Sequence, residues 1–201
     1  MSRMLLIATL LLVAGPVGGA DATGGQPADV RTAIFAGGCF WCIEADFEKL
    51  PGVIAVESGY TAGRTPKPTY EQVSSGNTGH TEAVRVSYDA RQLSYGQLLD
   101  YFWRHIDPTV RNRQFCDVGS QYRSGIYWQN EVERKAAEGS RDALLASGKL
   151  PRIETEIAAA SVFYLAEEYH QDYYRKNSVR YSYYRLSCGR DARVRQIWGN
   201  D

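Results

Sequence analysis

The sequence predicts an α+β fold with a split βαβ core, a ferredoxin-like two-layer sandwich with extra helices and long loops. Short apolar stretches typical of strands alternate with helical patterns, in the order β-α-β, β-α-β and α-β-α. Two long polar loops, residues 59–80 and 109–123, interrupt this alternation. The interruptions disfavour a doubly wound parallel sheet, which is the alternative. No repeat, low-complexity tract or second linker divides the chain, so we expect one domain over residues 32–201.

Each expected element depends on a local signal. The strands are expected at residues 32–36, 53–58, 83–88, 125–128 and 153–157. A helix begins at Cys39 and ends at Pro51-Gly52, with an apolar face formed by Phe40, Ile43, Phe47 and Leu50. Further helices are expected from the Ser94/Gln97 capping box to Asp107-Pro108, from Asn130 to about Ser147, and from Phe163 to Lys176.

The N-terminus has the pattern of a secretory signal peptide. Arg3 supplies the positive region, residues 4–14 are apolar, and Gly18-Gly19-Ala20 offers small residues for cleavage after Ala20 or Ala22. An apolar stretch of this length is too short to span about 30 Å of hydrocarbon. We therefore expect residues 1–20 to be a signal peptide, residues 21–31 a flexible lead-in, and the mature protein to be exported to a bacterial periplasm without a stable membrane anchor.

The composition excludes some classes of protein. Lys and Arg total 23, as do Asp and Glu, so the formal net charge is zero. Without a basic excess there is little to neutralise phosphates, which argues against a nucleic-acid partner. The chain has 14 Tyr and 4 Trp, more aromatic residues than a disordered chain would carry. We expect a folded monomer.

The most informative segment is GGCFWC at residues 37–42. The two glycines allow a sharp turn from strand to helix and leave Cys39 at the helix start, where the helix dipole favours a thiolate. Cys42 lies one helical turn later, within reach of a disulfide with Cys39. Two alternatives remain: a structural pair of cysteines, or a zinc site made from Cys39, Cys42, Cys116 and Cys188. Structural zinc sites usually take their ligands from two closely spaced pairs, whereas Cys116 and Cys188 each lack a second cysteine nearby in the sequence.

Several ordered motifs together carry a family resemblance. They are GCFW followed by Glu44, SGYTAG at 58–63, PTYEQV at 68–73, GHTEAVRVSYD at 79–89, DPT at 107–109, NRQFCDVGSQYRSGIY at 112–127 and EYHQDYY at 168–174. Over about residues 32–177 the chain closely resembles the methionine-S-sulfoxide reductase A family. The resemblance implies a thiol-dependent oxidoreductase that repairs methionine sulfoxide, free or within oxidised proteins and peptides.

The resemblance also implies roles for individual residues. Cys39 would attack the sulfoxide sulfur, and Glu82 would protonate its oxygen, since that oxygen leaves poorly unless protonated. A carboxyl group among aromatic rings would have a raised pKa and could stay protonated near neutral pH. The expected substrate contacts are Phe40 and Trp41 around the methyl group, Tyr70 and Tyr122 on the oxygen, and Asp117 completing the site. His80 and His170 are assigned no catalytic role.

Turnover requires a second thiol, because the attack leaves a sulfenic acid on the nucleophile. We expect Cys42 to be the resolving cysteine, with Cys188 in a mobile segment as the alternative. Cys116 lies beside Asp117 and could instead pair structurally with Cys188. No nucleotide motif is present, so we expect no bound cofactor or metal and an external thiol reductant, either a thioredoxin-like protein or a dithiol.

Two other classes of protein remain as alternatives. A thiol–disulfide oxidoreductase could use the Cys39–Cys42 pair to exchange disulfides without any sulfoxide substrate. Such a protein needs neither an acid like Glu82 nor a methyl pocket. An exported structural domain could carry disulfides 39–42 and 116–188 with no enzymatic role.

Overall fold

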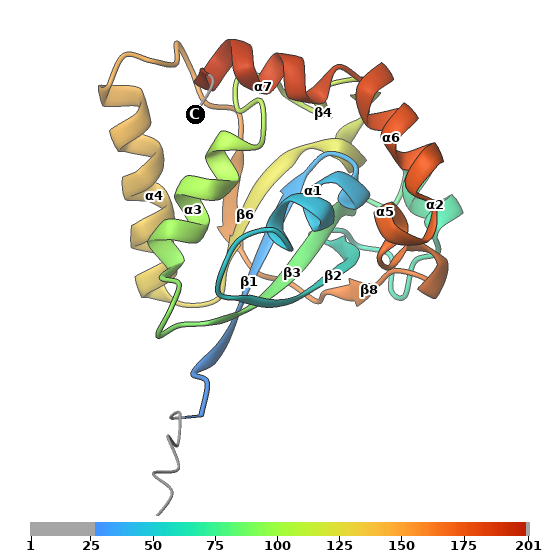
Figure 1. Ribbon diagram of the computed structural model, residues 1–201, viewed down its shortest axis with the longest axis horizontal. Helices are drawn as coiled ribbons and strands as arrows, with labels where there is room; N and C mark the ends of the chain where they lie inside the picture. The colour runs from blue at the N-terminus through green and yellow to red at the C-terminus, as the bar shows by residue number, and fades with distance from the viewer. Residues whose placement is uncertain (1–26, 200–201) are drawn as a thin grey trace, which may run out of the picture.

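A six-stranded sheet forms the centre of the computed structural model, which describes residues 27–199 (Figure 1). Its strand order is β7-β6-β1-β3-β2-β8. The strands are β1 (Val30–Gly37), β2 (Val53–Thr61), β3 (Thr81–Asp89), β6 (Ser124–Trp128), β7 (Glu156–Ala159) and β8 (Tyr164–Leu165). A separate two-stranded ribbon pairs β4 (Arg113–Gln114) with β5 (Asp117–Val118).

The central strands are antiparallel to their neighbours. β3 pairs with both β1 and β2, and β1 also pairs with β6. The chain therefore leaves β1 through helix α1 (Phe40–Phe47) and returns in β2 with β3 between the two. Among the strands of residues 27–199, only β6 and β7 pair in parallel. The α+β class predicted from the sequence is confirmed.

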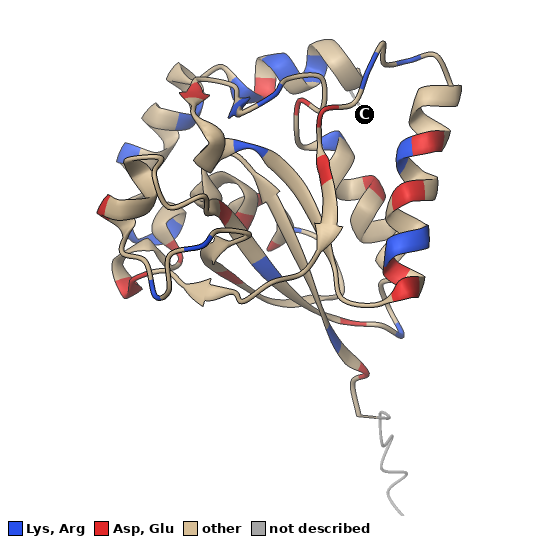
Figure 2. Cartoon of the chain, turned by 180° about the vertical axis from the view of Figure 1, so that it is seen from behind, with Lys and Arg blue, Asp and Glu red and all other residues tan. Residues whose placement is uncertain are grey.

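The remaining helices surround the sheet. They are α2 (Tyr70–Ser74), α3 (Tyr95–Arg104), α4 (Glu131–Ala146), α5 (Tyr173–Lys176), α6 (Ser178–Ser187) and α7 (Arg190–Trp198). Figure 1 shows α1 in front of the sheet, α3 and α4 to one side, and α6 and α7 along its upper margin. Acidic and basic residues alternate along α4 in Figure 2 and do not form a basic stripe.

Aromatic packing joins the first strand to the helices. The ring of Phe35 on β1 lies 5.1 Å from that of Phe47 on α1 and 5.0 Å from that of Phe102 on α3. All three side chains are buried, and each removes a large apolar area from water. Because Phe47 is the last residue of α1, this cluster holds that end of the helix against β1.

Two helix starts predicted from capping residues are confirmed. The Ser94 side chain accepts from the backbone N–H of Gln97, and the Gln97 side chain accepts from the N–H of Ser94. The Asn130 side chain accepts from the backbone N–H of Glu133 at the start of α4. These local signals identified the helix starts because they need no tertiary partner.

The predicted helix from Phe163 to Lys176 is wrong. Tyr164 and Leu165 instead form β8, which pairs with β2 opposite Tyr60 and Gly59. A Cβ atom on Gly59 would lie 2.4 Å from the Phe163 ring, so the absence of a side chain there permits this close packing. Only Tyr173–Lys176 is α-helical in this segment, since pairing with the sheet outweighs the helical pattern.

Other segments also differ from the sequence expectations. The polar loop 59–80 contains α2, and loop 109–123 contains the β4–β5 ribbon. Helices α6 and α7 occupy a C-terminal stretch for which the sequence predicted no helix. Among the described residues, no helix is both long and apolar enough to cross a membrane. The predicted signal peptide at residues 1–20 lies outside the described residues.

Candidate active site

Two glycines place Cys39 at the start of α1. Gly38 has φ of +83°, a left-handed conformation that side chains rarely adopt, and a Cβ atom there would lie 2.5 Å from Gln114 Cβ. A Cβ atom on Gly37 would lie 2.5 Å from Ile43 Cδ1. Cys39 is therefore the residue before the first turn, and its carbonyl accepts from the backbone N–H of Cys42 at 3.1 Å.

A cavity of about 80 Å³ opens beside Cys39. Its lining residues come from α1, α2, β3, β5, α6 and the 3₁₀ turn Ser120–Tyr122. They are Cys39, Phe40, Trp41, Tyr70, Glu82, Asp117, Tyr122 and Tyr184. All except Tyr184 were selected from the sequence, and the fold brings these distant residues together around one small volume.

A larger cavity elsewhere contains none of the predicted residues. It has a volume of about 590 Å³ and lies between α3, α6 and α7, where Arg185 and Trp198 contribute to its wall. The smaller cavity is the better candidate site because a nucleophile, a buried acid and aromatic walls converge there.

Glu82 is a buried carboxyl group within the site. Its side chain is 2 % exposed, and its Oε2 accepts from the backbone N–H of Phe40 at 2.9 Å. Burial raises the pKa of Glu82 to about 8, and the negative charge of Asp117 also raises it. The hydrogen bond from Phe40 acts in the opposite direction and is outweighed. At neutral pH the carboxyl group is therefore mostly protonated, in agreement with the raised pKa predicted from its motif.

The two thiols of α1 are free and form a buried pair. Burial raises the pKa of the Cys39 thiol well above its usual value, and the hydrogen bond with Cys42 raises it further. The same hydrogen bond lowers the pKa of Cys42, and Arg190 and Arg185 lower it as well. The expectation that the helix start would favour a thiolate on Cys39 is wrong in direction. Burial and the hydrogen bond with Cys42 are the main causes, and the negative charge of Asp117 adds to them.

The aromatic wall is held in place by neighbouring side chains. Trp41 stacks on Tyr173 with ring centroids 3.7 Å apart, and its Nε1 donates to Nδ1 of His170 at 3.0 Å. The Phe40 ring lies 5.0 Å from the His170 ring and 5.8 Å from the Tyr60 ring. His170 thus contacts both Phe40 and Trp41 and helps to hold the aromatic wall in place.

Tyr184 is the lining residue that the sequence analysis missed. Its hydroxyl donates to Asp117 Oδ2 at 2.6 Å, and its ring meets the Trp41 ring edge-on with centroids 5.9 Å apart. Asp117 also accepts from the backbone N–H of Cys39. Neighbouring tyrosines at 181 and 183 share the same helix, so composition alone could not show which ring faces the cavity.

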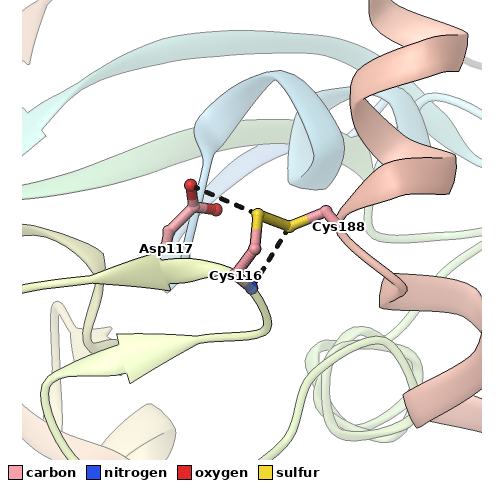
Figure 3. Close-up of side chains that lie close together, drawn as sticks. All are labelled: Cys116, Asp117 and Cys188. Atoms are coloured by element: carbon pink, nitrogen blue, oxygen red, sulfur yellow. Dashed lines mark hydrogen bonds between the residues drawn. A yellow bond between two sulfur atoms is a disulfide. The ribbon is translucent and has the colours of Figure 1, made fainter.

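A disulfide joins Cys116 to Cys188 beside the site, with Cα atoms 5.0 Å apart (Figure 3). This is one of the pairings that the sequence left open. Cys188 directly follows α6 and carries no free thiol in this state. Asp117 Oδ1 lies 3.8 Å from Cys116 Sγ. A four-thiolate zinc site would require both cysteines to be free.

Comparisons with known proteins give a consistent result. A family model described as peptide methionine sulfoxide reductase matches residues 31–201. "Peptide methionine sulfoxide reductase MsrA 2" of Caulobacter vibrioides is 47 % identical, covering 98 % of this chain and 99 % of that protein. The crystal structure of reduced Mxr1 from Saccharomyces cerevisiae is 33 % identical with a TM-score of 0.69, covering 74 % of this chain and 86 % of that one. Mxr1 in complex with Trx2 is 22 % identical with a TM-score of 0.50, covering 76 % and 91 %, and shows likeness of fold alone.

Proposed function

Since the chain belongs to the peptide methionine sulfoxide reductase family, we propose that it reduces methionine-S-sulfoxide to methionine with Cys39 as the nucleophile. The chain is an oxidoreductase of that family. The substrate is the free amino acid or a residue within an oxidised protein or peptide. One observation carries this assignment: Cys39, the buried acid Glu82 and the aromatic wall converge on a single cavity.

The first step combines nucleophilic attack with proton donation. The sulfur of Cys39 attacks the sulfoxide sulfur, while protonated Glu82 donates its proton to the sulfoxide oxygen. A bond between the two sulfurs forms as Cys39 releases its thiol proton. The hydroxyl group then transfers to the Cys39 sulfur, the S–S bond and the S–O bond of the substrate break, and methionine leaves with Cys39 as a sulfenic acid. Glu82 suits this role because burial keeps its carboxyl group protonated at neutral pH.

The other lining residues orient the substrate. Burial raises the pKa of Tyr70 to about 12 and also raises that of Tyr122, so both hydroxyls remain available as donors to the sulfoxide oxygen. Phe40 and Trp41 form an apolar wall that suits the methyl group of the substrate. Asp117 accepts from the backbone N–H of Cys39 and so helps to hold the nucleophile in position.

We propose Cys42 as the resolving cysteine. Cys42 follows Cys39 by three residues at the start of α1, and both thiols are free and buried in the same cluster, so a disulfide between them needs little movement of the backbone. Attack on the Cys39 sulfenic acid would form the 39–42 disulfide and release water. The alternative, Cys188, is bonded to Cys116 in this state and would first require reduction.

The experiment for Cys42 maps the new disulfide. Enzyme reduced only at Cys39 and Cys42 receives one equivalent of sulfoxide, free thiols are trapped, and peptides are analysed by mass spectrometry. A 39–42 bridge is expected. A 39–116 or 39–188 bridge, with full multiple turnover retained in Cys42→Ser, would exclude Cys42 from recycling.

Recycling requires an external thiol and no bound cofactor. Thioredoxin-like proteins are the proposed partners, supported by the structure of the yeast relative Mxr1 in complex with Trx2. Such a dithiol protein would open the intramolecular disulfide by thiol–disulfide exchange.

The assay that tests the overall function uses both epimers of a dabsylated methionine sulfoxide with dithiothreitol. Turnover of the S epimer alone is expected. If the protein reduces neither epimer but does reduce a disulfide in another protein, the chain is a thiol–disulfide oxidoreductase and the proposal is wrong. A protein inactive in both assays would be a structural domain.

For the fold, we propose that β1-α1-β2-β3-α3-β6 is a split βαβ, ferredoxin-like core within one catalytic domain over residues 32–201. The antiparallel order β6-β1-β3-β2 supports this assignment. Limited proteolysis tests the single domain: cleavage into two separately stable fragments would contradict it.

Export to the periplasm is also proposed, on the signal-peptide pattern of residues 1–20. Expression in a bacterial host with and without these residues, followed by cell fractionation, tests it. Periplasmic protein beginning at Asp21 or Thr23 is expected, and a full-length chain retained in the cytoplasm would refute export.

A further inference from the structure

Cys42 lies next to a buried cluster of charges that the proposed reaction does not yet use. Asp46 follows Cys42 by one turn of α1, and both side chains are buried. Arg185 from α6 places Nη1 2.9 Å from Asp46 Oδ1, and Arg190 from α7 places Nε 3.6 Å from Asp46 Oδ2. Two arginines, and the exposed Lys49 at 3.5 Å, therefore share one buried carboxylate that lies one turn after Cys42 on α1.

Arg190 is the more deeply buried of the two arginines. It is 2 % exposed, and its guanidinium lies 4.5 Å from the centroid of the Phe115 ring. Its Nη1 donates to the carbonyl of Gly37 at 3.2 Å, and its Nη2 donates to the carbonyl of His105 at 2.9 Å. Its Nε has no hydrogen-bond partner. These contacts fix the guanidinium against the segment that leads into Cys39.

The charges of this cluster do not balance within the buried volume. Arg185 has a second acidic partner, Asp191, whose side chain is about half exposed. The nearest acidic partner of Arg190 is Asp46, whose Oδ2 lies 3.6 Å away and has no hydrogen-bond partner, while Asp117 and Asp191 act on it as further negative charges. A buried cation whose nearest counter-ion is shared with a second cation is stabilised by a further negative charge close by. Cys42, one turn before Asp46 on the same helix, can supply that charge as a thiolate.

We propose that Arg190, supported by Arg185, is a positioning residue that holds the negative charge of the thiol pair on Cys42. The proposal rests on the assigned reaction and adds a role to it. In the resting enzyme Cys39 keeps its proton and donates a hydrogen bond to the Cys42 thiolate. The lowered pKa of Cys42 and the raised pKa of Cys39 agree with this arrangement.

This charge placement gives Cys42 two successive roles. As Cys39 attacks the sulfoxide sulfur, its proton passes to the Cys42 thiolate, and the proton of Glu82 passes to the sulfoxide oxygen. The negative charge then rests on Glu82, and Cys39 carries the sulfenic acid. Cys42 next loses its proton and attacks the sulfur of Cys39, displacing hydroxide that leaves as water. The sulfoxide is the only oxidant consumed.

Several ionisable groups face Cys42 and contribute to its titration. They are Cys39 and Asp46 from α1, Glu82 from β3, Tyr173 from α5, Tyr181, Tyr184 and Arg185 from α6, and Arg190 from α7. Among these groups the two arginines alone are cations. Removing one of them should therefore raise the pKa of Cys42, whereas changing a tyrosine hydroxyl should not.

The test is a pH titration of thiolate absorbance in a Cys39→Ser protein with its 116–188 disulfide intact. The serine hydroxyl can still donate to a thiolate at Cys42, and subtraction of Cys39→Ser/Cys42→Ser isolates that thiolate. The midpoint is expected below about 8.5, the value of an ordinary cysteine. Adding Arg190→Gln should lower the thiolate fraction at neutral pH by about tenfold or more.

Two matched variants complete the experiment. Arg190→Lys keeps the charge and should restore the thiolate fraction to within about threefold. Arg195→Gln removes a charge from the exposed side of the same helix and should leave the midpoint unchanged. If Arg190→Gln fails to fold, Arg185→Gln should raise the midpoint in the same direction.

A midpoint at or above about 8.5 in Cys39→Ser overturns the proposal without any arginine variant. So does an unchanged midpoint in folded Arg190→Gln. The titration needs no sulfoxide, so its result is independent of the assigned reaction. Failure of that reaction would instead appear as no methionine released from the S epimer by the reduced wild-type protein.

Discussion

Replacing Glu82 with Gln tests the acid that the site places opposite Cys39. The amide keeps an oxygen that can accept from the backbone N–H of Phe40, so the 2.9 Å contact can persist. What the variant loses is the proton that a carboxyl group with a pKa of about 8 still carries at neutral pH. Loss of acid catalysis should lower kcat/KM by about 10²–10⁴-fold at neutral pH.

The same pKa predicts how this loss depends on pH. About nine-tenths of Glu82 is protonated near pH 7 and about one-tenth near pH 9, given a pKa of about 8. The ratio of wild-type to variant kcat/KM should therefore fall by about tenfold between these two pH values. Using the ratio cancels the ionisation of the thiols, which both proteins share.

The stability of the variant separates acid catalysis from misfolding. A raised carboxyl pKa means that the wild type is most stable below the unfolded value of 4.5 and loses stability as pH rises toward 8. By neutral pH this loss is on the order of 3 kcal/mol. Glu82→Gln has no such loss, so urea unfolding should show it to be at least as stable as the wild type at neutral pH.

Two outcomes would refute this reasoning. A near-normal rate in Glu82→Gln at neutral pH would remove Glu82 from the mechanism. A reduced rate with a ratio that does not change between pH 7 and 9 would show that the carboxyl group acts through shape and not through its proton.

Three further predictions concern the nucleophile, the disulfide and an orienting tyrosine. Cys39→Ser should abolish reduction while circular dichroism stays native, because a hydroxyl does not ionise near neutral pH; residual turnover above a few per cent would place the nucleophile elsewhere. The double variant Cys116→Ser/Cys188→Ser should lose about 4 kcal/mol of unfolding free energy in urea, since the disulfide closes a sequence separation of 72 residues. Wild type with that disulfide reduced is the control. Equal stability of the oxidised wild type and the variant would contradict this value. Tyr70→Phe should lower kcat/KM by about 10- to 100-fold through one lost hydrogen bond to the oxygen; an unchanged kcat/KM would show that this hydroxyl does not contact the substrate.

Local sequence signals were sufficient where a few neighbouring residues determine the local structure. The capping residues Ser94 and Asn130 identified helix starts, and Gly37-Gly38 identified the turn before Cys39. The motifs also selected seven of the eight residues that line the cavity. The raised pKa of Glu82 was also predicted, because the motifs around it place its carboxyl group among aromatic rings.

Tertiary structure decided what depends on residues distant in the chain. Phe163 and Tyr164 leave the expected helix because β2 offers a partner strand and Gly59 offers space. Tyr184 enters the site only because the fold brings α6 to Asp117, where the Tyr184 hydroxyl donates to Asp117 and Cys188 pairs with Cys116.

The charge state of the thiols was likewise outside the reach of the sequence. The helix start pointed to a thiolate on Cys39, but burial and the hydrogen bond with Cys42 raise the pKa of Cys39, while Arg190 and Arg185 help to lower the pKa of Cys42. Sequence by itself determined which residues could react. Solvent exclusion and long-range charge, which exist only in the folded chain, decided which of the two thiols holds the proton.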